Sequence, residues 1–184
     1  DRGCFVYKSL MPTLPKRNHH FTEVWNIHKS GKYIWFQSDF NLLRFDGSKS
    51  ISIPYKYKIT TSALIRGRLY IASKEGGICQ LNGKTFTSVP GGEHVKGMRV
   101  CALLPYQKGN ILIVTEFCGV FIFDGATVRP FEMDIDPFLK ANQVFCAATN
   151  ERELVFGTVN NGIIINDITN GSNTFVNMST GLQN

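Results

Sequence analysis

Residues 111–125 read ILIVTEFCGVFIFDG, in which two apolar runs flank a polar, glycine-containing turn and the second run ends at Asp-Gly. The same arrangement occurs in residues 34–47 (IWFQSDFNLLRFDG), in residues 69–83 (LYIASKEGGICQLNG) and in residues 154–167 (LVFGTVNNGIIIND), which continue to an Asn-Gly pair at 170–171. Short apolar and aromatic runs bounded by Gly, Asn and Asp are typical of β-strands. Asp-Gly and Asn-Gly favour type I′ hairpin turns with positive φ at both central positions. Each unit therefore predicts strands joined by tight turns.

The four units begin at residues 34, 69, 111 and 154, so they recur roughly every 40 residues, a period typical of propeller blades when the content is strands. A further run precedes each unit, as in residues 62–65 (SALI), and another follows it, as in residues 85–89 (TFTSV). We therefore expect an all-β fold, a β-propeller built of four-stranded antiparallel blades, with four blades in this chain. The apolar first strand of each blade should be buried near the central axis.

A single propeller segment, residues 1–184, is expected to divide into blades at the turn-rich links. The expected blades occupy residues 21–55, 56–91, 92–133 and 134–178. Residues 1–20 read as the outer strand of a preceding blade (FVYKSL at 5–10) with its link, and residues 179–184 as the lead into a next blade. Because an unclosed array would leave an apolar face at each end, we expect a fragment of a larger, seven-bladed type of propeller. A closed ring of four blades is the alternative.

The composition is that of an ordinary globular domain. The chain has 184 residues, of which 43% are hydrophobic and 18% charged, and this balance excludes disorder as the main state. Its richest apolar stretch, residues 111–123, contains Glu116 and is shorter than the roughly 18 apolar residues of a membrane helix, so we expect no membrane insertion by this segment. The net charge of +6 is scattered, so no nucleic acid partner is expected. Five widely spaced cysteines exclude a CxxC pair and a dense disulfide framework.

Catalytic and metal motifs are absent from the sequence. There is no Gly-x-Ser-x-Gly turn, no sialidase-type Asp box and no phosphate-binding glycine loop. The histidines, which lack a carboxylate or cysteine at a ligand spacing, are His19, His20, His28 and His94. We therefore expect no metal, no cofactor and no enzyme. A glycosidase pair among Asp39, Glu75 and Glu116, which recur at comparable places in three blades, stays open, although turn position also explains the recurrence.

Several of the repeated strings carry a family resemblance. Residues 33–37 (YIWFQ) are followed by residues 42–46 (LLRFD), residues 154–158 (LVFGT) are followed by residues 161–163 (NGI), and the chain ends in GLQN at 181–184. These strings resemble the regulator-propeller (two-component regulator propeller) repeats of periplasmic sensor regions in Bacteroidetes hybrid two-component systems and in LuxR-tailed propeller regulators. The Asp-x-Asp-Gly turn that is frequent between the first two strands of that family is missing here.

The resemblance implies a function as well as a fold. It implies an extracytoplasmic, periplasmic segment of a membrane-anchored regulator that senses a ligand, such as a carbohydrate or another small molecule, or couples a signal. The implied partners are an oligosaccharide or other small ligand, the remaining blades and downstream domains of the same receptor, and a second copy in a homodimer. Two alternatives are a protein-interaction scaffold of the kelch or WD type, whose signature motifs are absent, and a glycan-acting enzyme.

One face of the expected propeller collects the candidate ligand-binding residues. In an up-and-down blade the loop between the second and third strands and the link to the next blade emerge on the same face. Aromatic rings beside charged and amide groups suit the capture of a sugar or peptide, although ordinary solvated loops would also account for them. The candidate residues are Asp39, Phe40, Tyr55, Tyr57, Lys74, Glu75, His94, Lys96, Glu116, Phe117, Asn160 and Asn161.

Overall fold

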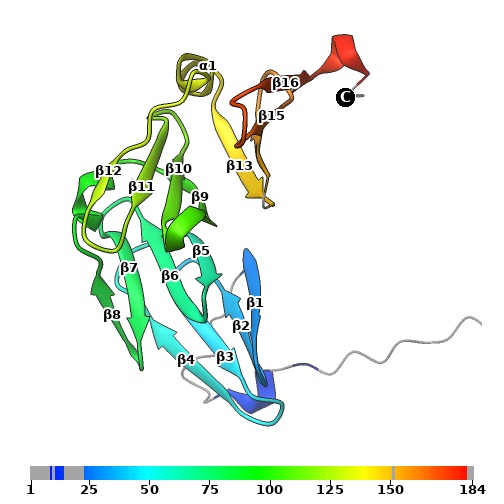
Figure 1. Ribbon diagram of the computed structural model, residues 1–184. Coiled ribbons are helices and arrows are strands. Elements are labelled where there is room, and N and C mark those ends of the chain that lie inside the picture. Colours follow the sequence, from blue (N-terminus) through cyan, green and yellow to red (C-terminus); the bar gives the residue numbers. More distant parts are fainter. Residues whose placement is uncertain (1–8, 10, 15–22, 151, 182–184) are drawn as a thin grey trace, which may run out of the picture.

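The computed structural model describes residues 9, 11–14, 23–150 and 152–181. Within these ranges the chain forms four antiparallel sheets of four strands each, and in every sheet the strands are neighbours in sequence order. We refer to these sheets as blades 1 to 4 (Figure 1).

The strands have the following bounds. Blade 1 contains β1 (Asn26–Ser30), β2 (Tyr33–Gln37), β3 (Asn41–Phe45) and β4 (Ser50–Pro54). Blade 2 contains β5 (Ile59–Ile65), β6 (Arg68–Ser73), β7 (Gly77–Asn82) and β8 (Thr85–Ser88). Blade 3 contains β9 (Val100–Pro105), β10 (Ile111–Thr115), β11 (Val120–Phe123) and β12 (Val128–Pro130). Blade 4 contains β13 (Val144–Thr149), β14 (Glu153–Thr158), β15 (Ile163–Asp167) and β16 (Asn173–Val176).

The short helices lie in the links between blades, in the β9–β10 turn and at the two ends. They are the 3₁₀ turns η1 (Met11–Thr13), η3 (Gly92–Val95), η4 (Gln107–Gly109) and η5 (Met178–Thr180) and the α-helix α1 (Asp136–Ala141). Helix α1 was not expected from the sequence, because six residues are too few to show a helical period. No helix in the described ranges is long and apolar enough to cross a membrane.

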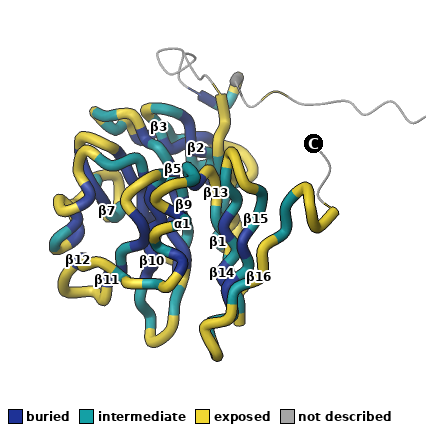
Figure 2. The backbone as a smooth tube through the Cα atoms, turned by 90° about the horizontal axis from the view of Figure 1, so that it is seen from above, coloured by how far each residue is buried: buried dark blue, intermediate teal, exposed yellow. Residues whose placement is uncertain are grey.

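The first strands of the blades form the inner edge of an arc. Strand β1 contacts β5, β5 contacts β9, and β9 contacts β13, so the blades follow one another around a common axis (Figure 1). The expected burial of these inner strands is confirmed in the middle blades, where β5 and β9 are mostly buried. It is wrong in the outer ones, where Ile27 of β1 is 63% exposed and Phe145 of β13 is 61% exposed. The reason is that β5 and β9 have a described inner strand on each side, whereas β1 and β13 have one on a single side (Figure 2).

Three apolar cores lie between successive blades, and β10 shows how one strand serves two of them. Ile111 and Ile113 pack against blade 2, while Leu112 and Val114 pack against blade 4. Side chains alternate between the two faces of a strand, so a strand covered on both faces must be apolar at every position. This explains the unbroken run ILIV, which the sequence analysis used to place the strand.

The turns between the third and fourth strands stand where Asp-Gly and Asn-Gly predict them, but the expected type I′ geometry is wrong. Only the glycines have positive φ, such as 100° at Gly47 and 94° at Gly125. The preceding Asp46 instead uses its carboxylate to accept hydrogen bonds from the amides of Ser48 and Lys49, at 3.0 and 2.8 Å. Asp124 does the same with the two amides that follow Gly125, both at 2.9 Å. A side chain that caps its own turn makes a second positive φ unnecessary.

At the N-terminal end, most of residues 1–20, including the expected outer strand at 5–10, lie outside the described residues. The hydroxyl of Thr13 lies 2.5 Å from that of Ser50 in β4, and Leu14 is buried. At the other end, η5 covers part of the expected lead into a next blade, and residues 182–184 lie outside the description.

Candidate functional site

The loops between the second and third strands are closed by a hydroxyl at the end of the second strand. Ser73 Oγ accepts a hydrogen bond from the Gly76 amide at 2.8 Å. Thr115 Oγ1 accepts one from the Cys118 amide at 3.0 Å and donates one to the Gly119 carbonyl at 2.6 Å. Thr158 Oγ1 makes the corresponding two bonds, at 3.1 and 2.9 Å. These loops are therefore compact turns whose backbone polar groups are satisfied locally.

Backbone hydrogen bonds join each of the first three loops to the link that starts the next blade. The amide of Ile59 donates to the Asp39 carbonyl at 2.6 Å, and the amide of Gly97 donates to the Lys74 carbonyl at 2.8 Å. The amide of Val144 donates to the Glu116 carbonyl at 2.9 Å. The structure thus brings loops and links together on one face in pairs, with each pair at a boundary between two blades. We call this the loop face.

The carboxylate of Asp39 lies at the first of these boundaries. Its Oδ1 accepts a hydrogen bond from Trp25 Nε1 at 2.9 Å, and its Oδ2 lies 3.1 Å from Lys58 Nζ. Trp25 precedes β1 of the same blade, whereas Lys58 precedes β5 of the next. Asp39 therefore ties together the chain segments that enter blades 1 and 2.

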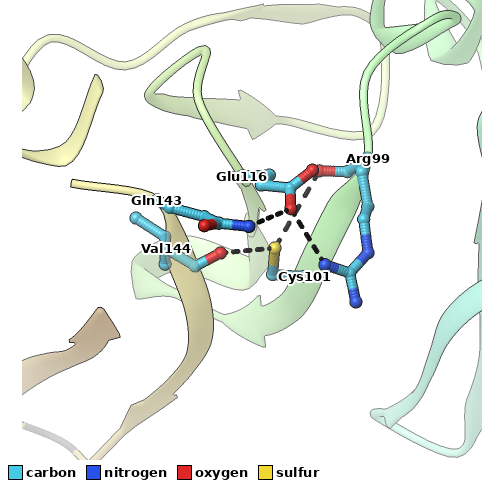
Figure 3. A network of polar contacts seen from close by, with 5 residues as sticks. All are labelled: Arg99, Cys101, Glu116, Gln143 and Val144. Atoms are coloured by element: carbon cyan, nitrogen blue, oxygen red, sulfur yellow. Dashed lines mark hydrogen bonds and ion pairs between the residues drawn. The ribbon is translucent and has the colours of Figure 1, made fainter. Parts of the chain in front are cut away.

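Glu116 occupies the equivalent place between blades 3 and 4 (Figure 3). Its Oε1 accepts hydrogen bonds from Gln143 Nε2 at 2.9 Å and from Arg99 Nη1 at 3.0 Å. The bond from Gln143 and the neighbouring Arg99 charge lower the pKa of Glu116, so this carboxylate stays ionised. Gln143 has φ of 45°, a strained conformation for a residue other than glycine. The site therefore holds Gln143 in an unfavourable backbone conformation while its amide reaches Glu116.

Cys101 lies beside this network and is a hydrogen-bond donor. Its Sγ is 3.0 Å from the Val144 carbonyl (Figure 3). Burial raises the pKa of the Cys101 thiol to about 11, so it is protonated at neutral pH. A thiol in that state is a poor nucleophile and a poor metal ligand.

The candidate tyrosines are packed into the protein. The Tyr55 ring meets those of Phe86 and Tyr57 edge to face, with centroids 4.9 and 5.8 Å apart, and its hydroxyl lies 3.4 Å from Cys79 Sγ. Burial raises the pKa of Tyr55 to about 12. Lys56 covers the Tyr57 ring at 4.6 Å from its centroid. These rings are half-buried and stabilise the link between blades 1 and 2.

The other candidates divide into exposed residues and residues that bond the framework. Phe40 and Phe117 are 49% and 50% exposed. His94 Nδ1 lies 3.0 Å from the Val128 carbonyl of β12, a strand of the outer half of blade 3. Asn161 donates to the side chain of Asn142. The candidates that remain exposed in loops or links are Lys74, Glu75, Lys96 and Asn160.

A buried polar network near the axis escaped the sequence analysis. Gln37, which is fully buried, accepts hydrogen bonds at Oε1 from Ser62 Oγ at 2.9 Å and from Asn26 Nδ2 at 2.8 Å. His28 Nε2 lies 2.8 Å from the same Ser62 hydroxyl, and burial lowers the pKa of His28. The network joins blades 1 and 2. Nothing in the sequence pairs these residues, because Ser62 lies on a different blade from the others.

None of the twelve candidates lines any of the five cavities described. Those cavities are formed by other parts of the blades, and no group of three or more metal-ligating side chains occurs in the described part of the chain. The largest cavity, about 510 Å³, lies among the turns between first and second strands, which are at the opposite edge of the blades. Its lining residues are Arg66, Pro105, Tyr106, Gln107, Thr149, Asn150 and Ile168. This cavity could not be predicted from the sequence, since the three turns differ in length and composition.

No family model matches the chain, and no curated protein matches it. Solved structures do match. The extracellular domain of BT3049, named as a hybrid two-component system of B. thetaiotaomicron, covers 83% of this chain with TM-score 0.64 and 17% identity, over 24% of its own length. That of BT4673, named as a one-component system of the same bacterium, covers 84% with TM-score 0.65 and 16% identity, over 22% of its length. Virginiamycin B lyase from Staphylococcus aureus covers 86% with TM-score 0.65 and 12% identity, over 56% of its length.

The fold is that of a β-propeller. The expected fold class, with four-stranded antiparallel blades and four of them here, is confirmed. The chain spans less than a quarter of the two extracellular domains that it resembles. Because a lyase and two signalling proteins share this fold at such low identity, the likeness establishes architecture, and function must be argued from the sites.

Proposed function

We propose that this chain is an extracytoplasmic ligand-sensing or signal-coupling propeller segment of a bacterial two-component or transcriptional regulator. The observation that carries the proposal is the likeness of its four blades to the extracellular domains of BT3049 and BT4673. The repeat strings of the sequence resemble the same class of sensor regions, and this supports the proposal from a separate direction. A carbohydrate or another small molecule is the proposed ligand.

The chemistry of the loop face favours binding over catalysis. A retaining or inverting glycosidase needs one carboxyl group with a raised pKa to act as general acid. Glu116 has a lowered pKa, and both Glu116 and Asp39 are occupied by cationic or amide partners from neighbouring segments. We therefore propose that Asp39 and Glu116 fasten blades together and that the segment is not an enzyme.

The proposed partners include the rest of the same receptor. Ile27, Phe36 and Leu43 pair across β1, β2 and β3 and so share one sheet face, while Trp35 and Leu42 on the other face pack against blade 2. The face away from blade 2 is thus largely apolar, and although Leu43 is buried, Ile27 is 63% exposed on it, which is surface that a further blade would cover. We propose that additional blades, downstream domains or a second copy cover such faces.

A thermal-shift screen tests the sensing function. The 184-residue chain would be melted with a panel of neutral and acidic oligosaccharides, because a ligand that binds only the native state raises its stability, by about 2.7 kcal/mol at a concentration a hundredfold above Kd. We expect at least one sugar to raise the melting temperature without being consumed. Turnover of that sugar would contradict a purely binding role, and no shift with any sugar would contradict carbohydrate sensing by this segment.

A further inference from the structure

The largest cavity described lies between the edges of blades 2, 3 and 4, on the side opposite the loop face. Three turns form it: the β5–β6 turn with Arg66, the β9–β10 turn with Tyr106 and Gln107, and the β13–β14 turn with Asn150. A volume of about 510 Å³ lies within the range of about 300–1,000 Å³ for small-molecule sites. We call it the turn cavity.

Arg66 is held at this cavity by an unusual backbone. It has φ of 50° and is followed by Gly67 with φ of 74°, a conformation that costs energy for a residue with a side chain. Its guanidinium lies against Gly109 so closely that a Cβ at that position would collide with it. Within the described ranges, no ion pair or hydrogen bond joins this guanidinium to another residue. The turn cavity therefore contains an exposed positive charge that has no counter-ion among the residues the structure describes.

The other walls of the turn cavity are suited to a flat, partly apolar ring. Tyr106 is held edge to face against Phe131, with ring centroids 5.4 Å apart, and Pro105 and Ile168 add apolar surface. Two described acidic residues lie close in sequence to the lining, and each is restrained by its own turn. Glu153 accepts a hydrogen bond from Asn150 Nδ2 at 2.9 Å, and Asp167 accepts one from the Thr169 amide at 2.7 Å.

We propose that the turn cavity binds a carboxylate-bearing sugar, that is, a uronic acid residue of an oligosaccharide. An arginine fork recognises a carboxylate through two parallel hydrogen bonds, and a tyrosine ring covers the apolar face of a pyranose. The inference rests on the proposed sensing function and goes beyond it, because it assigns a charge class to the ligand and a site on the face opposite the twelve candidates.

Calorimetric titration of the 184-residue chain with a matched pair of disaccharides tests the proposal. The probes are α-1,4-digalacturonate and its neutral counterpart, α-1,4-galactobiose, which differ at C6 only. We expect digalacturonate to bind about tenfold or more tightly than the neutral sugar, which corresponds to the strength of a hydrogen-bonded charge pair. Equal affinity, or no heat with digalacturonate, would overturn the proposal.

Variants of Arg66 distinguish binding at the turn cavity from general attraction to the positive net charge of the chain. Arg66→Asn removes the guanidinium, and Asn tolerates positive φ, so folding should be retained. We expect it to weaken digalacturonate binding at least about tenfold, and Arg66→Lys to weaken it less because it keeps the charge without the fork. Arg129→Asn on β12, an exposed residue away from the turn cavity, is the control and should bind as the unmodified chain does.

The outcomes distinguish this inference from the proposed function. If Arg66→Asn is unfolded by circular dichroism, the comparison of Arg66→Lys with the unmodified chain decides, and equal affinity there overturns the site. Digalacturonate that binds all variants with equal affinity would overturn the inference and leave the sensing function standing. Absence of binding by any sugar would contradict both.

Discussion

At the residue scale, Asp39 and Glu116 hold equivalent places and bind equivalent partners. Each accepts one hydrogen bond from a residue before the first strand of its own blade, Trp25 or Arg99, and contacts one residue before the next blade. Blade 2 departs from this pattern, because Lys74 occupies the equivalent backbone position and Glu75, the next residue, is exposed. The carboxylates of blades 1 and 3 are therefore structural ties at blade boundaries.

The substitution Glu116→Gln tests that role. It removes the charge that Arg99 and Gln143 recognise, and we expect a loss of about 1 kcal/mol in the free energy of unfolding, since the group is partly exposed and its bonds are screened. Glu75→Gln is the matched control, with an expected change within about 0.5 kcal/mol. Urea unfolding of both variants provides the measurement. Equal stabilities of the two variants would show that Glu116 does not link blades 3 and 4.

The low pKa of Asp46 predicts how the stability of the protein falls in acid. Its hydrogen bonds from the amides of Lys49 and Ser48 lower its pKa to about 2. A carboxyl with a lowered pKa in the folded state stabilises fully above its ordinary pKa, and this contribution is lost as the pH falls toward the folded value, here between about pH 4 and pH 2. Asp46→Asn keeps the acceptor oxygen but cannot titrate, so the decline in unfolding free energy over that interval should be shallower. Parallel acid limbs, measured by urea unfolding at each pH, would contradict this.

At the element scale, the strands could be located from the sequence, but the contacts made by residues at the ends of the strands could not. β10 was evident because both of its faces are buried and every position is apolar. The partners of Glu116 were not evident, since Arg99 and Gln143 lie 17 and 27 residues away in sequence. The type I′ prediction for the Asp-Gly turns was wrong because the Asp46 carboxylate caps its own turn. It accepts hydrogen bonds from the Ser48 and Lys49 amides, so positive φ at both central positions is not needed. The local pattern of apolar and turn residues is enough to locate a strand. Contacts between blades depend on how distant segments come together in space, and a single sequence does not show this.

The two faces of blade 3 belong to different cores, and this predicts that stability losses from one substitution on each face are additive. Ile113 belongs to the core shared with blade 2, and Ile122 belongs to the core shared with blade 4. Ile113→Val and Ile122→Val should each cost about 0.5–1.5 kcal/mol of unfolding free energy. The two residues are on adjacent strands, but their side chains point to opposite faces and share no core partner, so the double variant should equal their sum within about 0.5 kcal/mol. A larger coupling energy from the denaturation cycle would mean that the blade transmits strain from one core to the other.

At the scale of the whole molecule, the blades at the ends of the arc have apolar outer faces. In blade 4, Ala148, Val155 and Ile165 pair across three strands and share one face, while Leu154 and Phe156 pack against blade 3 from the other. Such faces are expected from the repeat alone. The approach of residues 11–14 to the outer face of blade 1, where Thr13 contacts Ser50, could not be predicted, because that contact joins residues 37 apart in sequence.

These faces predict self-association of the 184-residue chain, with Ile27 as a contact residue. Ile27 is 63% exposed on β1 and shares its sheet face with Phe36, so Ile27→Lys places a charge on the apolar face while changing the folded core little. We expect sedimentation velocity to show a concentration-dependent oligomer for the unmodified chain and a shift toward monomer for Ile27→Lys, with the melting temperature retained. Ala126→Lys, in the exposed β11–β12 turn, should associate as the unmodified chain does. An unmodified chain that stays monomeric at every concentration would show that apolar surface at the blade ends does not drive association, and the proposal that a second copy or further blades cover it would lose its physical basis.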